Sequence, residues 1–538
     1  MISSTSTARE RSSALLAARV FAGLLMALAT LWVVQYTTWP LAADQGFWLW
    51  VGEVITKGGW PYVDAWDIKG PFPFYVGALT HLLFGRTEWG IRVVDLIFVL
   101  GACIAIARLP MVRRRAVAVF AAPLAFLFWY GSLDVWRTAQ PDGWAGILIL
   151  LAVGAIAGRE EPGSFRYLAV GVLIGAAALV KPTFAIFLAL PVVIALGGGR
   201  RPARHRARGP AISVLGFVLA LAATATAFAA AGALHELIDA DILYVLGTYR
   251  NADAFAGGPV AGFLGMLRVS PLWLATPLVL IGLRELWGRD RDSFHLLVVW
   301  ILLVLVDIAV QGKYWPYHGL PALVPLAVAA GIGVDTAFQS FRPGLRGPDR
   351  WRQAIGVVLV VAACAQAIAV PLRQTATSLG ILAGLLPADA IFMKNAAVNS
   401  RGPDSLSGIA AYVRERTAPG QPVLAMSNLV VINYLADRPS PTRFGMTRGI
   451  LDGGDNPYRR RYREEFQAAL SRHPPEYIIL PSSEACAAAA TGSFIWRNCL
   501  NDYVWLDRLR RSRYRRETTR GAFDILRRKP DTVPVAHG

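Results

Sequence analysis

The chain has 538 residues, of which 55% are hydrophobic, and its formal net charge is +18 at pH 7. A mean hydropathy of +0.43, with repeated apolar runs of about 20 residues, excludes a soluble globular protein and predicts a polytopic membrane protein with helical spans. The positive charge does not indicate nucleic-acid binding, because most arginines fall in short loops between the apolar runs, as the positive-inside rule expects.

The N-terminal part begins with a polar segment, residues 1–18, which lacks a small-residue cleavage site and is predicted to be a cytoplasmic tail. The first apolar run, residues 19–39, is long enough to cross a membrane. Residues 40–89 follow it directly and are rich in charged and aromatic side chains. Charges at the mouth of a span are costly, so we expect this first outer loop to be the active-site loop.

Two apolar stretches of the first outer loop, residues 46–57 and 71–85, are short for a membrane span. If residues 71–85 crossed, the basic run Arg113–Arg115 would lie outside and most later loops would be inverted. We therefore expect both stretches to form helices along the outer interface.

The rest of the membrane domain, which is predicted to cover residues 19–371, brings the total to about eleven spans. Its further spans are expected at residues 90–108, 116–130, 142–158, 166–181, 183–197, 210–232, 270–287, 294–311, 318–338 and 353–371. The loops that become cytoplasmic in this arrangement are all rich in arginine. This asymmetry places the N-terminus inside and the C-terminus outside.

The C-terminal part, residues 372–538, has no further apolar run of spanning length and is long enough for one soluble domain. Residues 408–428 predict a helix, a Pro/Gly turn and a short strand, and residues 474–483 predict a second buried strand. Alternating helix and strand favours a small α/β domain outside the cytoplasm. In that compartment a disulfide between Cys486 and Cys499 is expected.

Several polar residues of the predicted outer face are candidates for a functional site. Asp44 follows the first span, and a carboxylate is unfavourable at a helix C-terminus, which points to function. Lys181 precedes Pro182 at a break in an apolar run and needs a partner. The other candidates are Asp64, Asp67, Lys69, Tyr75, Arg137, Asp142, Lys313, Tyr314 and His318.

Several of these residues also have an ordinary structural interpretation. Asp64 and Asp67 suit turns, and the Lys69 side chain could reach the interface by snorkelling. Asp142 suits a helix N-terminus, and His318 suits an aromatic belt at the membrane interface.

A carboxylate and several cations on one outer face fit the chemistry of a lipid-linked phosphosugar. Lysine or arginine would stabilise the leaving phosphate, and a carboxylate would deprotonate an acceptor hydroxyl. The sequence contains neither a GxxxxGK[ST] motif nor a Rossmann glycine pattern after a strand. This argues against ATP-driven transport and a Rossmann-type nucleotide-sugar site.

The order of motifs resembles the GT-C class of membrane glycosyltransferases. The resemblance rests on residues 43–46 (ADQG), Lys69-Gly70-Pro71 with Tyr75, Phe84-Gly85 and Arg92, and on residues 138–144, 175–191 and 312–327. The chain is similar to the lipid A aminoarabinose transferases, the protein O-mannosyltransferases and the rhizobial lipopolysaccharide galacturonosyltransferases. The C-terminal part is similar to the outer soluble domain that many members carry.

The resemblance implies roles for particular residues. Asp44 matches the first-loop aspartate taken as the catalytic base or as the acid that positions the acceptor, and Lys69 matches the lysine that contacts the polyprenyl phosphate. Asp142 and Lys181 fall in segments that border the donor site. With Lys69, we assign donor-phosphate binding to Lys181, Arg137 and Lys313. Substrate binding is assigned to Asp64, Asp67, Asp142, Tyr75, Tyr314 and His318.

The chain departs from the family pattern at two places. Ile68 precedes Lys69 where the aminoarabinose transferases have Glu, and Gly70 replaces the first Pro, so we predict no required metal in this first outer loop and leave a divalent metal elsewhere open. Gln45 follows Asp44 where the protein O-mannosyltransferases have an Asp-Glu pair, which disfavours a protein acceptor.

The expected function is therefore an inverting glycosyltransferase that uses a polyprenyl-phosphate sugar. It would act as a monomer at the outer face of the inner membrane, on an envelope lipid, lipopolysaccharide or other glycan. One alternative is a transporter or flippase of lipid-linked saccharides, which would need charged residues along a mid-membrane pathway. The other is a non-catalytic protein of polysaccharide assembly, which would tolerate Asp44→Asn.

Overall fold

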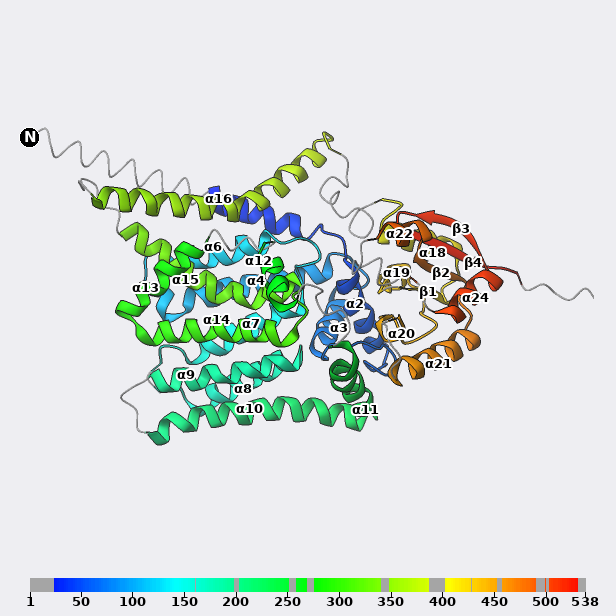
Figure 1. Cartoon of the computed structure of the whole chain (residues 1–538), viewed down its shortest axis with the longest axis horizontal. Helices are drawn as coiled ribbons and strands as arrows, with labels where there is room; N and C mark the ends of the chain where they lie inside the picture. The colour runs from blue at the N-terminus through cyan, green and yellow to red at the C-terminus, as the bar shows by residue number, and fades with distance from the viewer. Residues whose placement is uncertain are drawn as a thin grey trace, which may run out of the picture.

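A computed structural model describes residues 24–159, 161–197, 203–250, 258–268, 275–339, 348–386, 402–426, 428–451, 457–489, 499 and 503–530. Within these ranges the molecule is elongated, with a bundle of helices at one end and a four-stranded sheet at the other (Figure 1). Helices α2 (Ala43–Thr56) and α3 (Phe72–Phe84) lie between the bundle and the sheet (Figure 1).

The bundle begins with a helix at Leu24–Tyr36 and continues through most of the first 382 residues. Its further helices are α4 (Gly90–Arg108), α5 (Pro110–Arg113), α6 (Ala118–Gly131), α7 (Pro141–Ile156), α8 (Ser164–Ala178), η1 (Pro182–Leu188), α9 (Ala189–Gly197), α10 (Ala203–Ala230), α11 (Leu234–Leu237), the π-helix η2 (Ile238–Tyr249), α12 (Gly258–Arg268), α13 (Thr276–Arg289), α14 (Arg291–Gln311), η4 (Pro316–Ala322), α15 (Leu323–Gln339) and α16 (Pro348–Leu382).

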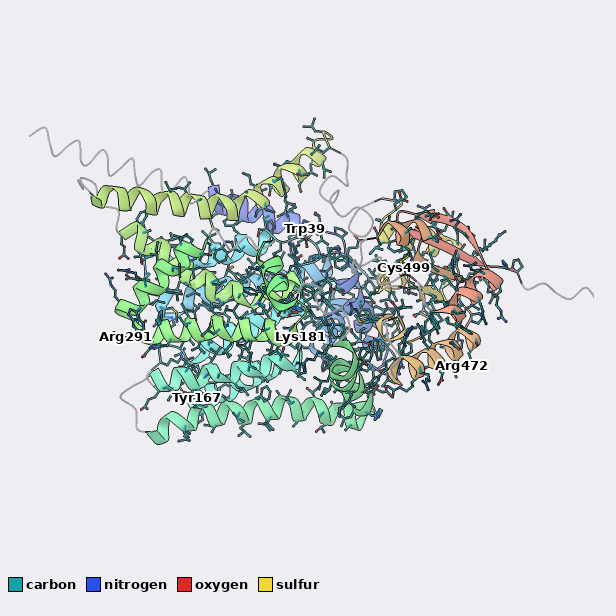
Figure 2. All side chains as sticks on the ribbon, in the orientation of Figure 1. Trp39, Tyr167, Lys181, Arg291, Arg472 and Cys499 are labelled. Atoms are coloured by element: carbon teal, nitrogen blue, oxygen red, sulfur yellow. A yellow bond between two sulfur atoms is a disulfide. The ribbon has the colours of Figure 1, made fainter. Side chains whose placement is uncertain are left out.

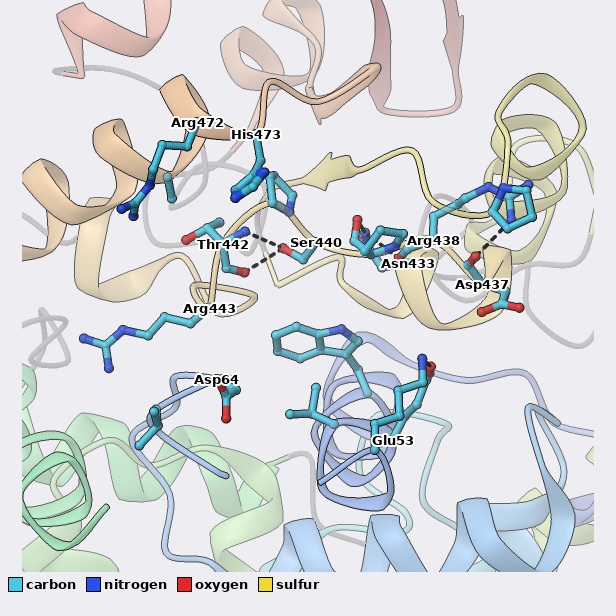
Figure 3. A pocket seen from close by; sticks show the side chains of 18 of the residues that line it. Glu53, Asp64, Asn433, Asp437, Arg438, Ser440, Thr442, Arg443, Arg472 and His473 are labelled. Atoms are coloured by element: carbon cyan, nitrogen blue, oxygen red, sulfur yellow. Dashed lines mark hydrogen bonds and ion pairs between the residues drawn. The ribbon is translucent and has the colours of Figure 1, made fainter. Parts of the chain in front are cut away.

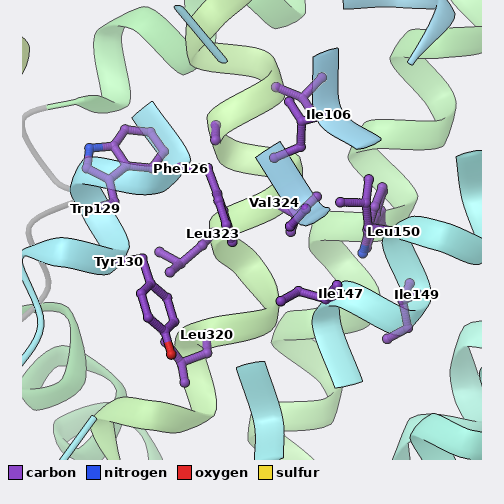
Figure 4. Packing of buried hydrophobic residues seen from close by; sticks show 14 of the residues in the cluster. Ile106, Phe126, Trp129, Tyr130, Ile147, Ile149, Leu150, Leu320, Leu323 and Val324 are labelled. Carbon is purple, nitrogen blue, oxygen red and sulfur yellow. The ribbon is translucent and has the colours of Figure 1, made fainter. Parts of the chain in front are cut away.

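Interlocking apolar side chains and close backbone approaches hold the bundle together. Phe126 of α6 and Leu323 of α15 belong to one buried cluster, to which α7 contributes Ile147 and Leu150 (Figure 4). Helices α8 and α10 touch at Gly171, where an added Cβ would lie 1.9 Å from the Ser213 carbonyl oxygen. Such contacts suit helices in lipid, where small residues let backbones approach closely.

Four described helices are long and apolar enough to cross a membrane: Gly90–Arg108, Ala207–Ala230, Arg291–Gln311 and Pro316–Gln339. Other predicted spans correspond to shorter apolar helices, among them α6, α7 and α8. The chain is therefore a mostly helical membrane protein, while the count of about eleven spans stays a prediction. Helix α16 runs through the expected domain boundary after residue 371, so the change in composition does not coincide with a helix end.

The stretches expected at the outer interface form helices α2 and α3, but α2 is largely buried. An added Cβ at Gly77 of α3 would lie 2.1 Å from the Trp48 carbonyl oxygen, so the two helices pack backbone to backbone. On its other side, an added Cβ at Gly46 would lie 2.2 Å from the Val431 side chain of the C-terminal part. Helix α2 is thus enclosed by protein, because glycines allow close approach on both of its sides.

The sheet of the C-terminal part has the strand order β1-β2-β4-β3. Strand β1 (Val423–Ala425) pairs in parallel with β2 (Tyr477–Pro481), and these are the two strands that the sequence predicted. Strand β4 (Phe523–Arg528) pairs antiparallel with both β2 and β3 (Tyr514–Arg520).

Helices surround this sheet and complete the C-terminal part. They are α18 (Leu406–Arg416), α19 (Val431–Ala436), α20 (Arg448–Leu451), α21 (Pro457–Arg472), α22 (Ser483–Ala488) and α24 (Val504–Arg513). Cys486 of α22 forms a disulfide with Cys499, with the two Cα atoms 5.9 Å apart.

Hydrogen bonds attach the C-terminal part to the loop between α2 and α3 and to the start of η2. The Trp66 amide donates to the Arg443 carbonyl at 2.8 Å, and the Arg443 guanidinium donates to the Tyr62 carbonyl at 2.5 Å. Further along, Arg461 and Tyr462 of α21 both donate to the Asp239 carboxylate at the start of η2. These contacts place the sheet region against the first outer loop and against η2.

Candidate functional site

Asp44 lies in the first turn of α2, and the local hydrogen bonds explain why the helix begins there. The Gln45 side chain accepts from the Ala42 amide at 2.8 Å and donates to the Val135 and Thr138 carbonyls. Gln140 donates to the Asp44 carboxylate at 3.3 Å. The prediction that Asp44 sits at a helix C-terminus is wrong, because a new helix begins here and its N-terminal end favours a carboxylate.

A buried polar network fixes the segment just before the helix that carries Asp44. The Asp95 carboxylate of α4 accepts hydrogen bonds from the Tyr36 hydroxyl at 2.6 Å, the Tyr130 hydroxyl at 2.7 Å and the Trp144 indole at 2.8 Å. One turn earlier, Arg92 donates to the Pro40 carbonyl at 2.8 Å. The network joins four helices, Leu24–Tyr36, α4, α6 and α7, to the segment just before α2.

Lys69 is brought close to the break after α8 by the residue that follows it. An added Cβ at Gly70 would lie 2.2 Å from the Leu179 carbonyl oxygen, so only glycine allows this approach. The Gly70 amide donates to the Val180 carbonyl at 3.3 Å. Glycine in place of the family's proline therefore has a structural reason here, and it places Lys69 beside the segment that carries Lys181.

Lys181 has the partners that its position at a break in an apolar run demands. Its ammonium lies 2.6 Å from the Asp142 carboxylate of α7 and 2.8 Å from the Gln311 side-chain oxygen of α14. Gln311 in turn donates to the Asp307 carboxylate at 2.7 Å. A buried ion pair with additional hydrogen bonds holds the lysine in place and leaves one face of its ammonium toward Tyr317, whose ring centre is 5.5 Å away.

Lys313 joins the end of α14 to the π-helix η2. Its ammonium donates to the Tyr249 carbonyl at 2.7 Å and lies 4.5 Å from the centre of the Tyr249 ring. The side chain is only 6% exposed. A π-helix within a helical segment often marks a functional site, and here it supplies one wall of a cavity.

These three lysines line one cavity of about 250 Å³. Lys181 lies toward the end of the bundle nearest the sheet (Figure 2). The apolar side of the cavity comes largely from η2 and α14, and its polar side from the loops. It is lined by Ile68, Lys69, Lys181, Pro182, Thr183, Asp241, Ile242, Val245, Leu246, Tyr249, Arg250, Val310, Gln311, Lys313, Tyr317 and His318.

The electrostatics of the loop residues favour a charged lysine beside buried carboxyl groups. Burial opposes the charge on Lys69, but the carboxylates of Asp67 and Asp44 outweigh burial and raise the pKa of this lysine. Burial raises the pKa of Asp67 to about 6, although Lys69 and the Ile68 amide act in the opposite direction. Lys69 is therefore a fixed cation at neutral pH, which is what an anionic ligand requires.

Seven predicted site residues do not line this cavity: Asp44, Asp67 and Asp142, described above, and Arg137, Tyr75, Tyr314 and Asp64. Arg137 pairs with Asp134 at 3.6 Å within its own loop. Tyr75 is 43% exposed on α3, and Tyr314 packs against Gly262 of α12. Asp64 caps the Trp60 amide at 2.7 Å and lines a different cavity.

That second cavity, of about 660 Å³, lies between the first outer loop and the C-terminal part and is lined by residues of both. Glu53 and Asp64 lie on one side, and Arg472 and His473 lie on the other (Figure 3). Among the lining residues, Arg443 is held by Glu465 at 2.7 Å and Arg438 donates to several backbone carbonyls. Polar side chains from two segments that are far apart in the sequence therefore line this cavity.

Several residues of the lysine cavity could not be found by the motif argument. Tyr249, Arg250 and Asp241 come from η2 and its end, in a long connection that has no recognisable pattern. Tyr317 is next to His318 in an aromatic segment that the sequence did single out. One signal in the sequence could have identified Asp241 as a site residue. It is a charged residue at the start of an amphipathic stretch between two predicted spans.

Comparisons with known proteins show what the chain is similar to. The family model described as dolichyl-phosphate-mannose-protein mannosyltransferase matches residues 68–228. A comparison with curated proteins found no match.

Among solved structures, ArnT from Cupriavidus metallidurans bound to undecaprenyl phosphate is similar, with a TM-score of 0.59 and 14% identity, covering 94% of this chain and 97% of that chain. The same protein in the apo state has a TM-score of 0.55 and 15% identity, covering 95% and 98%. The similarity to these structures shows a shared fold over nearly the whole chain. With the family match, it confirms the predicted resemblance to GT-C membrane glycosyltransferases and the prediction of a glycosyltransferase enzyme.

Proposed function

We propose that the protein transfers a sugar from a polyprenyl-phosphate donor to an envelope lipid, lipopolysaccharide or other glycan, with inversion at the anomeric carbon. The observation that carries this proposal is the convergence of Lys69, Lys181 and Lys313 on one cavity whose other wall is apolar. A phosphate needs cations, and a polyprenyl chain needs apolar surface. The cavity offers both.

The leaving phosphate is the group that these lysines would stabilise. As the bond between the anomeric carbon and the phosphate oxygen breaks, negative charge develops on that oxygen, and preorganised cations lower the barrier. The lipid would extend along the apolar residues of η2 and α14, such as Val245, Leu246 and Val310. The undecaprenyl phosphate bound to the similar ArnT supports this class of donor.

Asp44 is the proposed base that takes the proton of the acceptor hydroxyl. It lies at the N-terminal end of α2 and accepts a hydrogen bond from Gln140, which orients the carboxylate. Its charge acts on both Lys69 and Tyr317, so it lies within electrostatic reach of the cavity without lining it. A base at the rim would meet an acceptor that arrives from outside the donor cavity.

The acceptor would approach from the C-terminal part. The polar cavity between the first outer loop and the sheet region supports this direction, and it includes the predicted substrate residue Asp64. We place residues 372–538 on the outer side of the inner membrane and residues 1–18 in the cytoplasm, as the arginine-rich loops indicate. We further propose that the enzyme is a monomer and needs no metal, so a chelator would leave its activity unchanged.

Donor turnover in reconstituted membranes tests the proposal. Wild type and Asp44→Asn would receive a panel of undecaprenyl-phosphate sugars with an envelope lipid extract, and release of undecaprenyl phosphate would be measured. We expect the wild type to consume one donor and Asp44→Asn to lose about 100-fold or more in rate. Equal rates in the two proteins would remove Asp44 from the mechanism, and no turnover with any donor would contradict the proposed function.

A further inference from the structure

The lysine cavity contains a carboxyl group that a phosphate site does not explain. Asp241 is the one acidic residue among its described lining residues. A carboxylate repels a phosphate, so an aspartate in a cavity with three lysines and Arg250 either pairs with them or serves another part of the ligand. No hydrogen bond or ion pair joins Asp241 to a side chain in the part of the chain that the structure describes.

The position of Asp241 is fixed by the helix that carries it. Asp241, Val245 and Tyr249 recur at intervals of four residues in η2, and all three line the cavity. The start of η2 is held by Asp239, which accepts hydrogen bonds from Arg461 and Tyr462 of the C-terminal part. Asp241 is thus a buried, rigidly placed residue on the cavity-facing side of its helix, with 9% of its surface exposed.

The lysines of the cavity have partners other than Asp241. Lys181 pairs with the Asp142 carboxylate at 2.6 Å. Lys313 donates to the Tyr249 carbonyl at 2.7 Å and to the Arg250 carbonyl at 3.3 Å. Asp241 is therefore a carboxyl group of the same cavity that these interactions do not use.

The protonation of Asp241 suits contact with neutral polar groups. Burial raises the pKa of Asp241 to about 8, and the nearby Asp67 adds to this effect. At neutral pH the carboxyl group is mostly protonated, so it can both donate and accept hydrogen bonds. A buried carboxyl group without a partner is unfavourable, and a ligand with hydroxyl groups would satisfy it.

We propose that Asp241 recognises the sugar of the donor through hydrogen bonds to its hydroxyl groups, while the lysines that line the same cavity hold the phosphate. This proposal rests on the proposed function and adds a determinant of sugar specificity to the same site. A sugar is joined directly to its phosphate, so the ring of a donor held by the lysines would lie in the cavity that Asp241 also lines. The apolar residues of η2 that follow Asp241 remain available to the lipid.

Binding of two ligands that differ only in the sugar tests the assignment. The ligands are undecaprenyl phosphate and the undecaprenyl-phosphate hexose that the wild type consumes or, if none is consumed, the hexose that it binds most tightly. The protein is the full chain in nanodiscs. Asp241→Leu keeps the approximate size and removes the hydrogen bonds, Asp241→Asn keeps polar atoms at the same place, and Lys181→Met serves as the phosphate-site comparison.

We expect Asp241→Leu to weaken binding of the hexose-linked lipid about tenfold or more, with undecaprenyl phosphate binding changed less than twofold. Asp241→Asn should recover most of the hexose affinity, because an amide also donates and accepts. Lys181→Met should weaken both ligands to a similar extent. Equal weakening of both ligands by Asp241→Leu, or no weakening of either, would overturn the assignment.

The two proposals fail in different ways. If the wild type binds neither ligand, the proposed donor class is wrong. If the wild type binds both ligands and the lysine variant loses both, the donor class stands, and the Asp241 variants alone decide whether the sugar end is correctly assigned. A wild type that binds the two lipids with equal affinity would also overturn the assignment, because the sugar would then contribute nothing.

Discussion

The polar network around Asp95 and the lysine cavity are both built from charges at the ends of apolar helices, yet their side chains are satisfied differently. Asp95 accepts three hydrogen bonds from Tyr36, Tyr130 and Trp144. In contrast, one buried oxygen of Asp67 has no hydrogen-bond partner among the described residues. Asp241, at the cavity, is likewise buried and forms no side-chain hydrogen bond or ion pair with any described residue.

The difference indicates what each group of charges is for. A buried polar group that is satisfied by the protein stabilises one structure, whereas an unsatisfied one costs free energy unless a ligand completes it. The Asp95 network therefore serves to position the loop before α2. The lysine cavity, with Asp67 and Asp241 beside it, is arranged to accept a ligand.

The largest effect is expected from breaking the satisfied network. Asp95→Leu leaves two hydroxyls and an indole without an acceptor in a buried site, and should cost about 4 kcal/mol in the free energy of unfolding. Thermal unfolding in detergent would show this as a large fall in Tm. Asp134→Asn, at a carboxylate whose side chain is 41% exposed, serves as the control and should change stability little. Similar Tm values for the two variants would contradict a structural role for Asp95.

The pH dependence of the free energy of unfolding should show the titration of Asp67, which has a buried oxygen without a hydrogen-bond partner among the described residues. Its pKa is about 6 in the folded protein and 3.8 in the unfolded chain, so the folded state binds the proton more tightly. Its contribution to stability is therefore full below pH 4 and is lost as the pH rises through about 6, by about 3 kcal/mol. The difference in unfolding free energy between wild type and Asp67→Asn should follow this curve. A difference that stays constant from pH 4 to pH 7 would show that Asp67 does not titrate as described.

A double variant can separate ligand binding from stability at Lys181. Lys181→Met should weaken binding of undecaprenyl phosphate about 100-fold and should also lower Tm, because Asp142 then remains buried without its cation. Adding Asp142→Asn should recover the Tm while the affinity stays low. Recovery of both quantities would mean that Lys181 acts only as the partner of Asp142.

The smallest effect is expected at Arg137, which the sequence grouped with the lysines. It pairs with Asp134 in a partly buried loop and does not line the cavity. Arg137→Ala should therefore change the affinity for undecaprenyl phosphate less than twofold. A loss comparable to that of Lys181→Met would place Arg137 in the phosphate site after all.

The sequence by itself determined that the chain is a helical membrane protein, and it identified several of the polar residues of the site. Long apolar runs predicted the membrane helices, and hydrophobic segments between turn residues predicted β1 and β2. The lysines could be singled out because a cation at the end of an apolar run needs a partner or a ligand. These are local properties, and hydropathy and short-range spacing are enough to detect them.

Only the tertiary structure decided which of these residues share a site. Lys69, Lys181 and Lys313 meet because Gly70 allows the first outer loop to touch the end of α8 and because α14 ends against η2. The same folding leaves Arg137 and Tyr75 away from the cavity and brings in Asp241. Such proximity depends on packing between segments that are far apart in the chain, and no local pattern records it.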